Sequence, residues 1–424
     1  MRRLGLVAAL YVIGFLSSLG FSIVIPFLVF LVTRFGGNAF VLGGIGAAFW
    51  AAQFVGSSWL GPLSDRIGRK RVLVRCQLGA LVSWAVFLVA VYVPRVVIGD
   101  VDTRMTGAFT VTLPLVLITL SRVTDGLFDG SVSVANAYMA DTTTGHARKV
   151  GFARLGVANN LGFVLGPMLA GLIARTEAGM VAVVALALVL SGCAAVLARF
   201  RLPDVPAQPA PPPIGTKALL GAGCGEAVSR PPSRLRTVLA IPELRRMMAI
   251  YFLVFLGFSI FTAALPIHAA QDLGWTSGEL GVLFTVLAIA LVATEWLLLP
   301  PLAKRVPDRV LGAVGSVIVA AGYVLMATRS PAALYAGAIA YGVGNGLSWP
   351  SYLAMLARSG PRSMQGTVQG VGSSAGSIAS VLGTLTSGIL FETIGPRAFF
   401  VSAAALAGAT LLFFFSRVAD DDPV

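Results

Sequence analysis

The segment Arg122-Val-Thr-Asp125-Gly-Leu-Phe-Asp129 places a base and two acids inside a long apolar run. Because Arg122, Asp125 and Asp129 are three and four residues apart, they share one face of a helix. An ionised side chain at the bilayer centre costs about 2.5–3.5 kcal/mol, so such groups usually pair with one another or face a cavity. An i,i+3 ion pair between Arg122 and Asp125 would by itself only pack the helices. Asp129 is left without a local partner, which favours reversible proton binding.

Glu295 is a further acid inside an apolar run, near the end of its predicted helix. It is either a second proton or cation site or the interfacial partner of Lys304 or Arg305. No nucleophile–base pair, metal-ligand cluster or phosphate-binding loop accompanies these acids, and two aspartates on one helix do not make a catalytic site. The sequence therefore predicts neither an enzyme nor a bound metal or cofactor.

The composition places these residues in a membrane protein. Of 424 residues, 57% are hydrophobic and 12% charged, whereas soluble proteins carry about 25% charged residues. Twelve apolar runs are long enough to cross the bilayer core, which takes a helix of about 20 residues. The runs are Leu4–Val32, Phe40–Ser64, Val72–Val93, Val111–Met139, Gly151–Ala174, Met180–Ala198, Met247–Ala270, Gly278–Leu302, Val310–Thr328, Ala332–Ala357, Gly366–Phe391 and Ala398–Phe415.

The net charge of +13 is explained by membrane topology. With a cytoplasmic N-terminus, most Lys and Arg residues fall on the cytoplasmic side, as the positive-inside rule requires. We therefore expect a multi-pass protein of the plasma (inner) membrane with both termini in the cytoplasm and no nucleic-acid partner.

The two halves of the chain repeat in the same order. Leu19-Gly-Phe-Ser-Ile23 recurs as Leu256-Gly-Phe-Ser-Ile260. The two copies lie six runs apart, an even number, so both halves have the same orientation and are related by an axis along the membrane normal. The Pro-rich stretch between the halves is too polar to fold as a domain. We expect an all-α protein with an N-terminal six-helix bundle (1–200), a cytoplasmic linker (201–246) and a C-terminal six-helix bundle (247–424).

A charged loop separates the second and third runs. It reads Gly61-Pro-Leu-Ser-Asp-Arg-Ile-Gly-Arg-Lys70 and abuts apolar sequence on both sides. An ordinary basic loop would explain the arginines but neither the glycines nor the acid. The pattern resembles the signature loop between helices 2 and 3 of the major facilitator superfamily of transporters. The resemblance implies that Asp65 lies near the start of helix 11, around residues 363–366, and that the cytoplasmic gate consists of Gly61, Asp65, Arg66, Gly68, Arg69 and Lys70.

Two further elements resemble motifs of that superfamily. The helix 4 element R-x-x-x-G-x-x-x-G, associated with proton coupling, falls on Arg122, Gly126 and Gly130. The helix 5 element of exporters that exchange substrate for protons falls on Gly162, Gly166, Pro167 and Gly171. Ala170 stands where that element has another glycine. Close helix packing is the alternative explanation for the helix 5 glycines, because G-x-x-x-G is common in membrane helices.

Uncharged polar and aromatic side chains within the runs are candidates for a substrate cavity. The amides carry no charge that must be neutralised, and aromatic rings can form a cavity wall, although core packing is their commoner role. The candidates are Gln53, Trp50, Asn136, Asn159, Asn160, Asn345, Trp349 and Phe258.

Together the resemblances predict the major facilitator fold, with twelve transmembrane helices in two pseudo-symmetric bundles, in the drug:proton antiporter branch. They imply efflux of a small amphipathic compound in exchange for protons, carried out by a monomer in the lipid bilayer. Proton-coupled symport of a sugar, carboxylate or peptide is the alternative. A membrane-embedded enzyme or a substrate sensor on the same scaffold is a further alternative.

Overall fold

The computed structural model describes residues 2–103, 105–129, 131–143, 145–173, 179–204, 241–358 and 365–414. Six segments precede the predicted linker: α1 (Arg2–Ser22) with α2 (Ile25–Arg34), α3 (Ala39–Ile67), α4 (Arg69–Tyr92), α5 (Leu113–Asp129) with α6 (Ser131–Thr142), α7 (Gly145–Ile173), and α8 (Gly179–Arg201). Six follow it: α10 (Pro242–Ile267) with η1 (His268–Asp272), α11 (Ser277–Ala293) with η2 (Thr294–Leu298) and α12 (Leu299–Ala303), α13 (Asp308–Met326), α14 (Pro331–Arg358), α15 (Gln365–Ile394) with η4 (Gly395–Arg397), and α16 (Ala398–Phe414).

The six-plus-six arrangement agrees with the predicted fold class. By length and apolarity alone, nine helical spans among the described residues can cross a membrane, and one of them, Ser374–Phe414, runs through α15 and α16 together. Most of the predicted linker lies outside the described residues, and its last five residues, 242–246, belong to the first turns of α10. The division of the chain into two bundles and a linker remains a prediction.

Prolines account for breaks within single segments. Pro26, in the first turn of α2, has no N–H to continue the ladder from α1. Pro300 and Pro301 likewise withhold two donors just beyond α11. The backbone there widens into the π-helical η2, in which the Leu299 N–H bonds to Thr294 O, five residues back.

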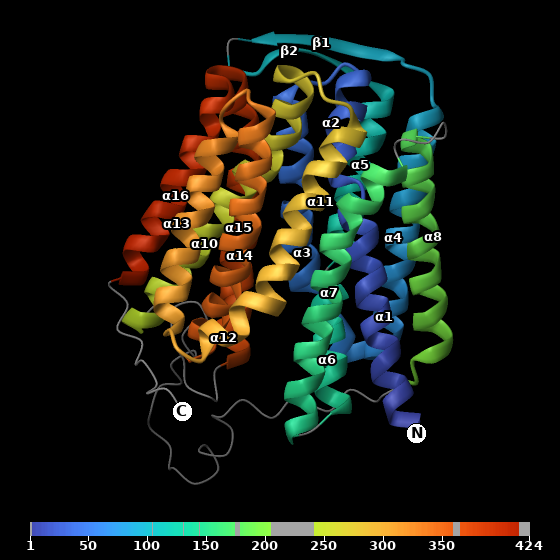
Figure 1. The fold of residues 1–424 in the computed structure, drawn as a ribbon. Coiled ribbons are helices and arrows are strands. Elements are labelled where there is room, and N and C mark those ends of the chain that lie inside the picture. The colour runs from blue at the N-terminus through green and yellow to red at the C-terminus, as the bar shows by residue number, and fades with distance from the viewer. Residues whose placement is uncertain are drawn as a thin grey trace, which may run out of the picture.

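The stretch between the third and fourth predicted apolar runs forms a small β-hairpin. Strands β1 (Val97–Thr103) and β2 (Gly107–Thr112) pair antiparallel, with Asp100 opposite Thr110. This hairpin is an addition to the predicted all-α architecture. It lies across one end of the molecule, called here the hairpin end, and α1 begins at the opposite end (Figure 1).

Among the described residues, the buried core joins the two bundles at the hairpin end. One cluster of buried side chains there contains Phe27 of α2 together with Phe261 of α10. Toward the opposite end the core divides into two separate clusters, one around Leu10 and Tyr138 and the other around Tyr352. The bundles therefore pack tightly at the hairpin end, and within the described residues each has its own core at the other.

Candidate functional site

The base and one acid of α5 form a buried ion pair. Arg122 Nη1 lies 3.1 Å from Asp125 Oδ2, and both side chains are at least nine-tenths buried. The guanidinium also lies over the Trp84 ring, with Arg122 Cζ 4.2 Å from the ring centroid, a geometry that favours a cation. The Nε and Nη2 atoms of Arg122 have no hydrogen-bond partner among the described residues. The i,i+3 pairing that the sequence suggested is present.

Asp129 has a partner that the sequence did not reveal. Its Oδ2 accepts a hydrogen bond of 2.5 Å from Gln53 Nε2 of α3. The prediction that Asp129 lacks a local partner was right for its own helix and wrong for the fold, because α3 packs against α5. The partner is a neutral amide, so Asp129 has no basic residue in an ion pair with it among the described residues.

Asp125 and Asp129 line a small polar cavity inside the first bundle. Its volume is about 20 Å³, enough for one water molecule. Serine hydroxyls, an amide and a thiol share the lining: Ser17, Ser131, Ser191, Gln77 and Cys76. The two acids thus face a chamber within one bundle and do not contribute to the large cavity between the bundles.

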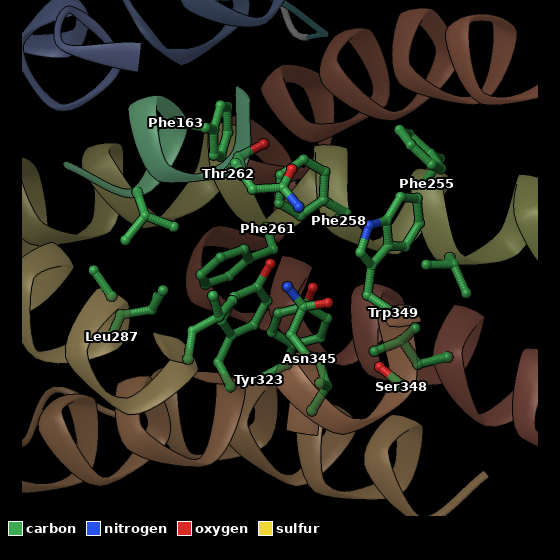
Figure 2. A pocket seen from close by; sticks show the side chains of 18 of the residues that line it. Phe163, Phe255, Phe258, Phe261, Thr262, Leu287, Tyr323, Asn345, Ser348 and Trp349 are labelled. Carbon is green, nitrogen blue, oxygen red and sulfur yellow. The ribbon is translucent and has the colours of Figure 1, made fainter. Parts of the chain in front are cut away.

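The large cavity has a volume of about 310 Å³ and takes its lining from both bundles. The first bundle supplies Trp50, Asn160, Phe163 and Pro167, and the second supplies most of the wall. Figure 2 shows Phe163 on one side and Phe258, Tyr323, Asn345 and Trp349 around the same space. The aromatic residues of the lining are Trp50, Phe163, Phe255, Phe258, Phe261, Phe284, Tyr323, Tyr341, Trp349 and Tyr352.

Five of the eight predicted cavity residues line this cavity: Trp50, Asn160, Phe258, Asn345 and Trp349. The other three do not. Gln53 bonds to Asp129, and Asn159 faces α1, where a Cβ on Gly14 would overlap its Oδ1 atom. Asn136 is half-buried on α6 and absent from the lining. The positions of these three residues around their helix axes direct the side-chain amides away from the large cavity.

Glu295 points to the large cavity. It stands in η2 and is part of the lining. Among the described residues it forms no ion pair, so the predicted alternative of a bridge to Lys304 or Arg305 is not present in this structure.

Arg69 is the centre of the predicted gate. It is buried, and its Nη2 lies 2.5 Å from Asp65 Oδ1 and its Nε 2.9 Å from Asp141 Oδ2. Asp141, near the end of α6, was missed by the sequence reasoning, because an acid at a helix end gives no sign of its distant partner. Gly68, with a φ of 99°, occupies a backbone conformation that favours glycine between α3 and α4.

The remaining gate residues are less constrained. Arg66 and half of Asp65 are exposed, and Lys70 is half-buried. A Cβ on Gly61 would meet no atom of the described residues within 4 Å. The expected contact of Asp65 around residues 363–366 lies outside the described side chains, so the gating role stays a prediction.

The motif glycines mark close helix contacts of two kinds. Gly126 of α5 packs against the Phe49 carbonyl of α3, and Gly166 of α7 against Ser22 and the Ile23 nitrogen. Gly162 also packs on α1, next to Phe15 O. Gly130 lies outside the described residues. Gly171 differs from these, because it meets Gly281 of α11 across the boundary between the bundles.

A second seam closes the hairpin end. Gly43 of α3 lies against Thr384 O and Gly388 of α15. Beside it, Glu392 Oε1 accepts a hydrogen bond of 2.9 Å from the Ala39 nitrogen at the start of α3. The hairpin covers this point, since a Cβ on Gly107 would lie 2.7 Å from Glu392 Oε2. Both bundles are therefore held together at the hairpin end by backbone-to-backbone packing.

Comparisons with known proteins agree with this architecture. The sequence model of a family described as Major Facilitator Superfamily matches residues 10–244 and 247–424. Human major facilitator superfamily domain-containing protein 10 is 27% identical over 395 residues, covering 89% of this chain and 78% of its own length. The class C tetracycline resistance protein of Escherichia coli is 24% identical over 374 residues, covering 87% and 85%.

Solved structures share the fold. The crystal structure of the human organic anion transporter MFSD10 (TETRAN) superposes with a TM-score of 0.66 at 22% identity, covering 97% of this chain and 99% of that one. The D-xylose-proton symporter gives a TM-score of 0.74 at 13% identity, with 100% of both chains covered. At such identities the likeness extends to the fold alone.

Proposed function

Since this chain belongs to the major facilitator superfamily, we propose that it exports a small amphipathic aromatic compound in exchange for protons by alternating access. The family and the solved structures that share its fold are transporters, which makes an enzymatic role the weaker alternative. The tetracycline resistance proteins of several bacteria match most of the chain, which supports export of a drug-like compound.

The lining of the large cavity carries the proposal. Aromatic and aliphatic side chains form most of it, and its few polar groups include Asn160, Thr262, Asn345 and Ser348. A sugar must exchange many hydrogen bonds with water for hydrogen bonds with protein, since unpaired polar groups are costly when buried. A carboxylate needs a cationic partner, and the described lining residues include no Lys, Arg or His. An amphipathic aromatic compound fits this wall better than either.

Proton coupling is assigned to the acids of α5. Arg122 already neutralises Asp125, whereas Asp129 has only the Gln53 amide as its side-chain partner among the described residues. We therefore place the exchanged proton on Asp129, with the Arg122–Asp125 pair as its charged neighbour. The small polar cavity gives that proton a water-sized space beside the carboxylate.

The packing of the bundles suggests which conformation this is. With both termini in the cytoplasm of a plasma (inner) membrane, the sealed hairpin end faces outward and the divided core faces inward. The protein, as a monomer, would then be in an inward-facing state. In that state the large cavity can take up substrate from the cytoplasm. Export requires that the Gly171–Gly281 and Gly43–Gly388 contacts separate during the cycle.

The test is export from cells. Bacteria that produce the chain are expected to retain less of at least one compound in a panel of cationic, neutral and anionic aromatic dyes than cells carrying an empty vector. Labelled sugars and dicarboxylates should enter both strains equally. Increased uptake of a sugar or dicarboxylate would instead support symport, and unchanged levels of every compound would contradict a transporter of this substrate class.

A further inference from the structure

We propose that the large cavity selects organic cations, with Glu295 as the counter-ion of the bound substrate. The proposal rests on the assignment of this cavity as the substrate site. Among the described residues that line it, Glu295 is the one acidic residue, and none is Lys, Arg or His. A bound anion would therefore face an acid and no base, whereas a bound cation would face an acid that has no ion-pair partner within the described part of the chain.

The position of Glu295 follows from the break beyond α11. Pro300 and Pro301 withhold their donors, and the chain passes through the π-helical η2. A π-helical turn carries one extra residue per turn and redirects the side chains within it, and such turns are frequent at functional sites. Glu295 reaches the cavity from this turn, while its neighbour Trp296 is 74% exposed on the outer surface.

The aromatic wall suits the same ligand. Phe255 and Trp349 meet edge to face with their centroids 5.6 Å apart, and Figure 2 shows Trp349, Phe258 and Phe261 around one space. Ring faces are the negative part of an aromatic quadrupole, and a desolvated cation over such a face gains about 2 kcal/mol or more. A carboxylate combined with aromatic faces recognises a hydrophobic cation without requiring a strict hydrogen-bond pattern.

The charged type of residue in the large cavity is therefore the opposite of what an organic anion requires: the described lining has an acid and no base. The human MFSD10 structure is that of an organic anion transporter and shares the fold at 22% identity. A shared fold at that identity does not imply a shared ligand. The acidic residue in the cavity lining of this chain favours organic cations as ligands.

The test uses two probe ions of nearly equal size and shape but opposite charge, tetraphenylphosphonium and tetraphenylborate. Equilibrium binding is measured on the purified full chain in detergent, with protein-free micelles subtracted. The wild-type protein is expected to bind the phosphonium at least tenfold more tightly than the borate. Glu295→Gln is expected to lose that preference. Glu279→Gln, a change of the same chemistry at the start of α11 and away from the cavity, should keep it.

Three results of the binding measurement would overturn the proposal: equal binding of both ions by the wild type, tighter binding of the borate, or an unchanged preference in Glu295→Gln. Binding is measured without a proton gradient, so a failure of proton coupling would leave this result intact. Conversely, cells that export only neutral or anionic dyes would retain the proposed export function and reject cation selectivity.

Discussion

Asp129→Asn is expected to abolish proton-driven transport while leaving the protein folded and inserted. Asparagine keeps the size of the side chain and can still bond to Gln53, which now holds Asp129 at 2.5 Å, but it cannot take up or release a proton. Exchange of labelled for unlabelled substrate needs no net proton movement, so it should continue in proteoliposomes. Accumulation driven by a pH gradient should fall to the level of protein-free vesicles.

Asp125→Asn provides the comparison on the same helix. It removes the partner of a buried Arg122, and breaking a buried ion pair by removing one member costs about 3–5 kcal/mol. We therefore expect a lower thermal stability for Asp125→Asn and a near wild-type stability for Asp129→Asn. If Asp129→Asn still concentrates substrate in response to a pH gradient, the proton does not travel on this carboxylate, and Asp125 becomes the next candidate.

Gly171→Leu is expected to prevent closure of the hairpin end. A Cβ alone at this position would overlap the Gly281 Cα across the bundle boundary, and the Gly281 carbonyl carbon would lie 2.8 Å away. Backbone atoms on both sides cannot move aside as a side chain can, so the two helices must separate. Overpacking of this kind costs about 1–3 kcal/mol, which shifts the ratio of two conformations about 5–150-fold. Efflux should fall because the inward-facing state is less populated.

The separation can be measured with spin labels on the exposed Leu172 and Gln271, at the hairpin ends of the two bundles, in a cysteine-free background. Gly171→Leu should lengthen the distance between the labels. Gly156→Leu is the matched control on α7, since a Cβ at Gly156 would meet no atom of the described residues within 4 Å. Equal distance distributions in Gly171→Leu and wild type would show that this seam does not have to open.

The sequence predicted best those features that depend on local spacing. The separation of Arg122 and Asp125 by three residues was enough to predict their ion pair, because helix geometry alone brings them together. The apolar runs also located the membrane segments, because the thickness of the bilayer sets the length of a helix that crosses it. The helix 5 glycines Gly162, Gly166 and Gly171 lie at close helix contacts, which is what the packing explanation of their spacing expects.

Features that depend on tertiary arrangement were harder to predict. Whether an amide faces the cavity depends on the rotation of its helix, so Asn160 and Asn345 line the cavity while Asn136 and Asn159 do not. Buried tyrosines such as Tyr323 line the cavity too, although nothing in the local sequence distinguishes them from core residues. The hairpin was not predicted, because its two strands pair only with each other and lie outside the apolar runs that defined the helices.

The central claim is proton–substrate exchange, and the direction of gradient-driven accumulation tests it most directly. Purified protein is reconstituted into vesicles, and a dye that the cells export and that has no titrating group is added outside. With an acidic lumen, protons leave as dye enters, so the dye should accumulate and should leak out when nigericin collapses the gradient. With an acidic exterior it should not accumulate. Accumulation with an acidic exterior would show symport, and accumulation independent of the gradient would show that no proton is coupled; either result would contradict the account.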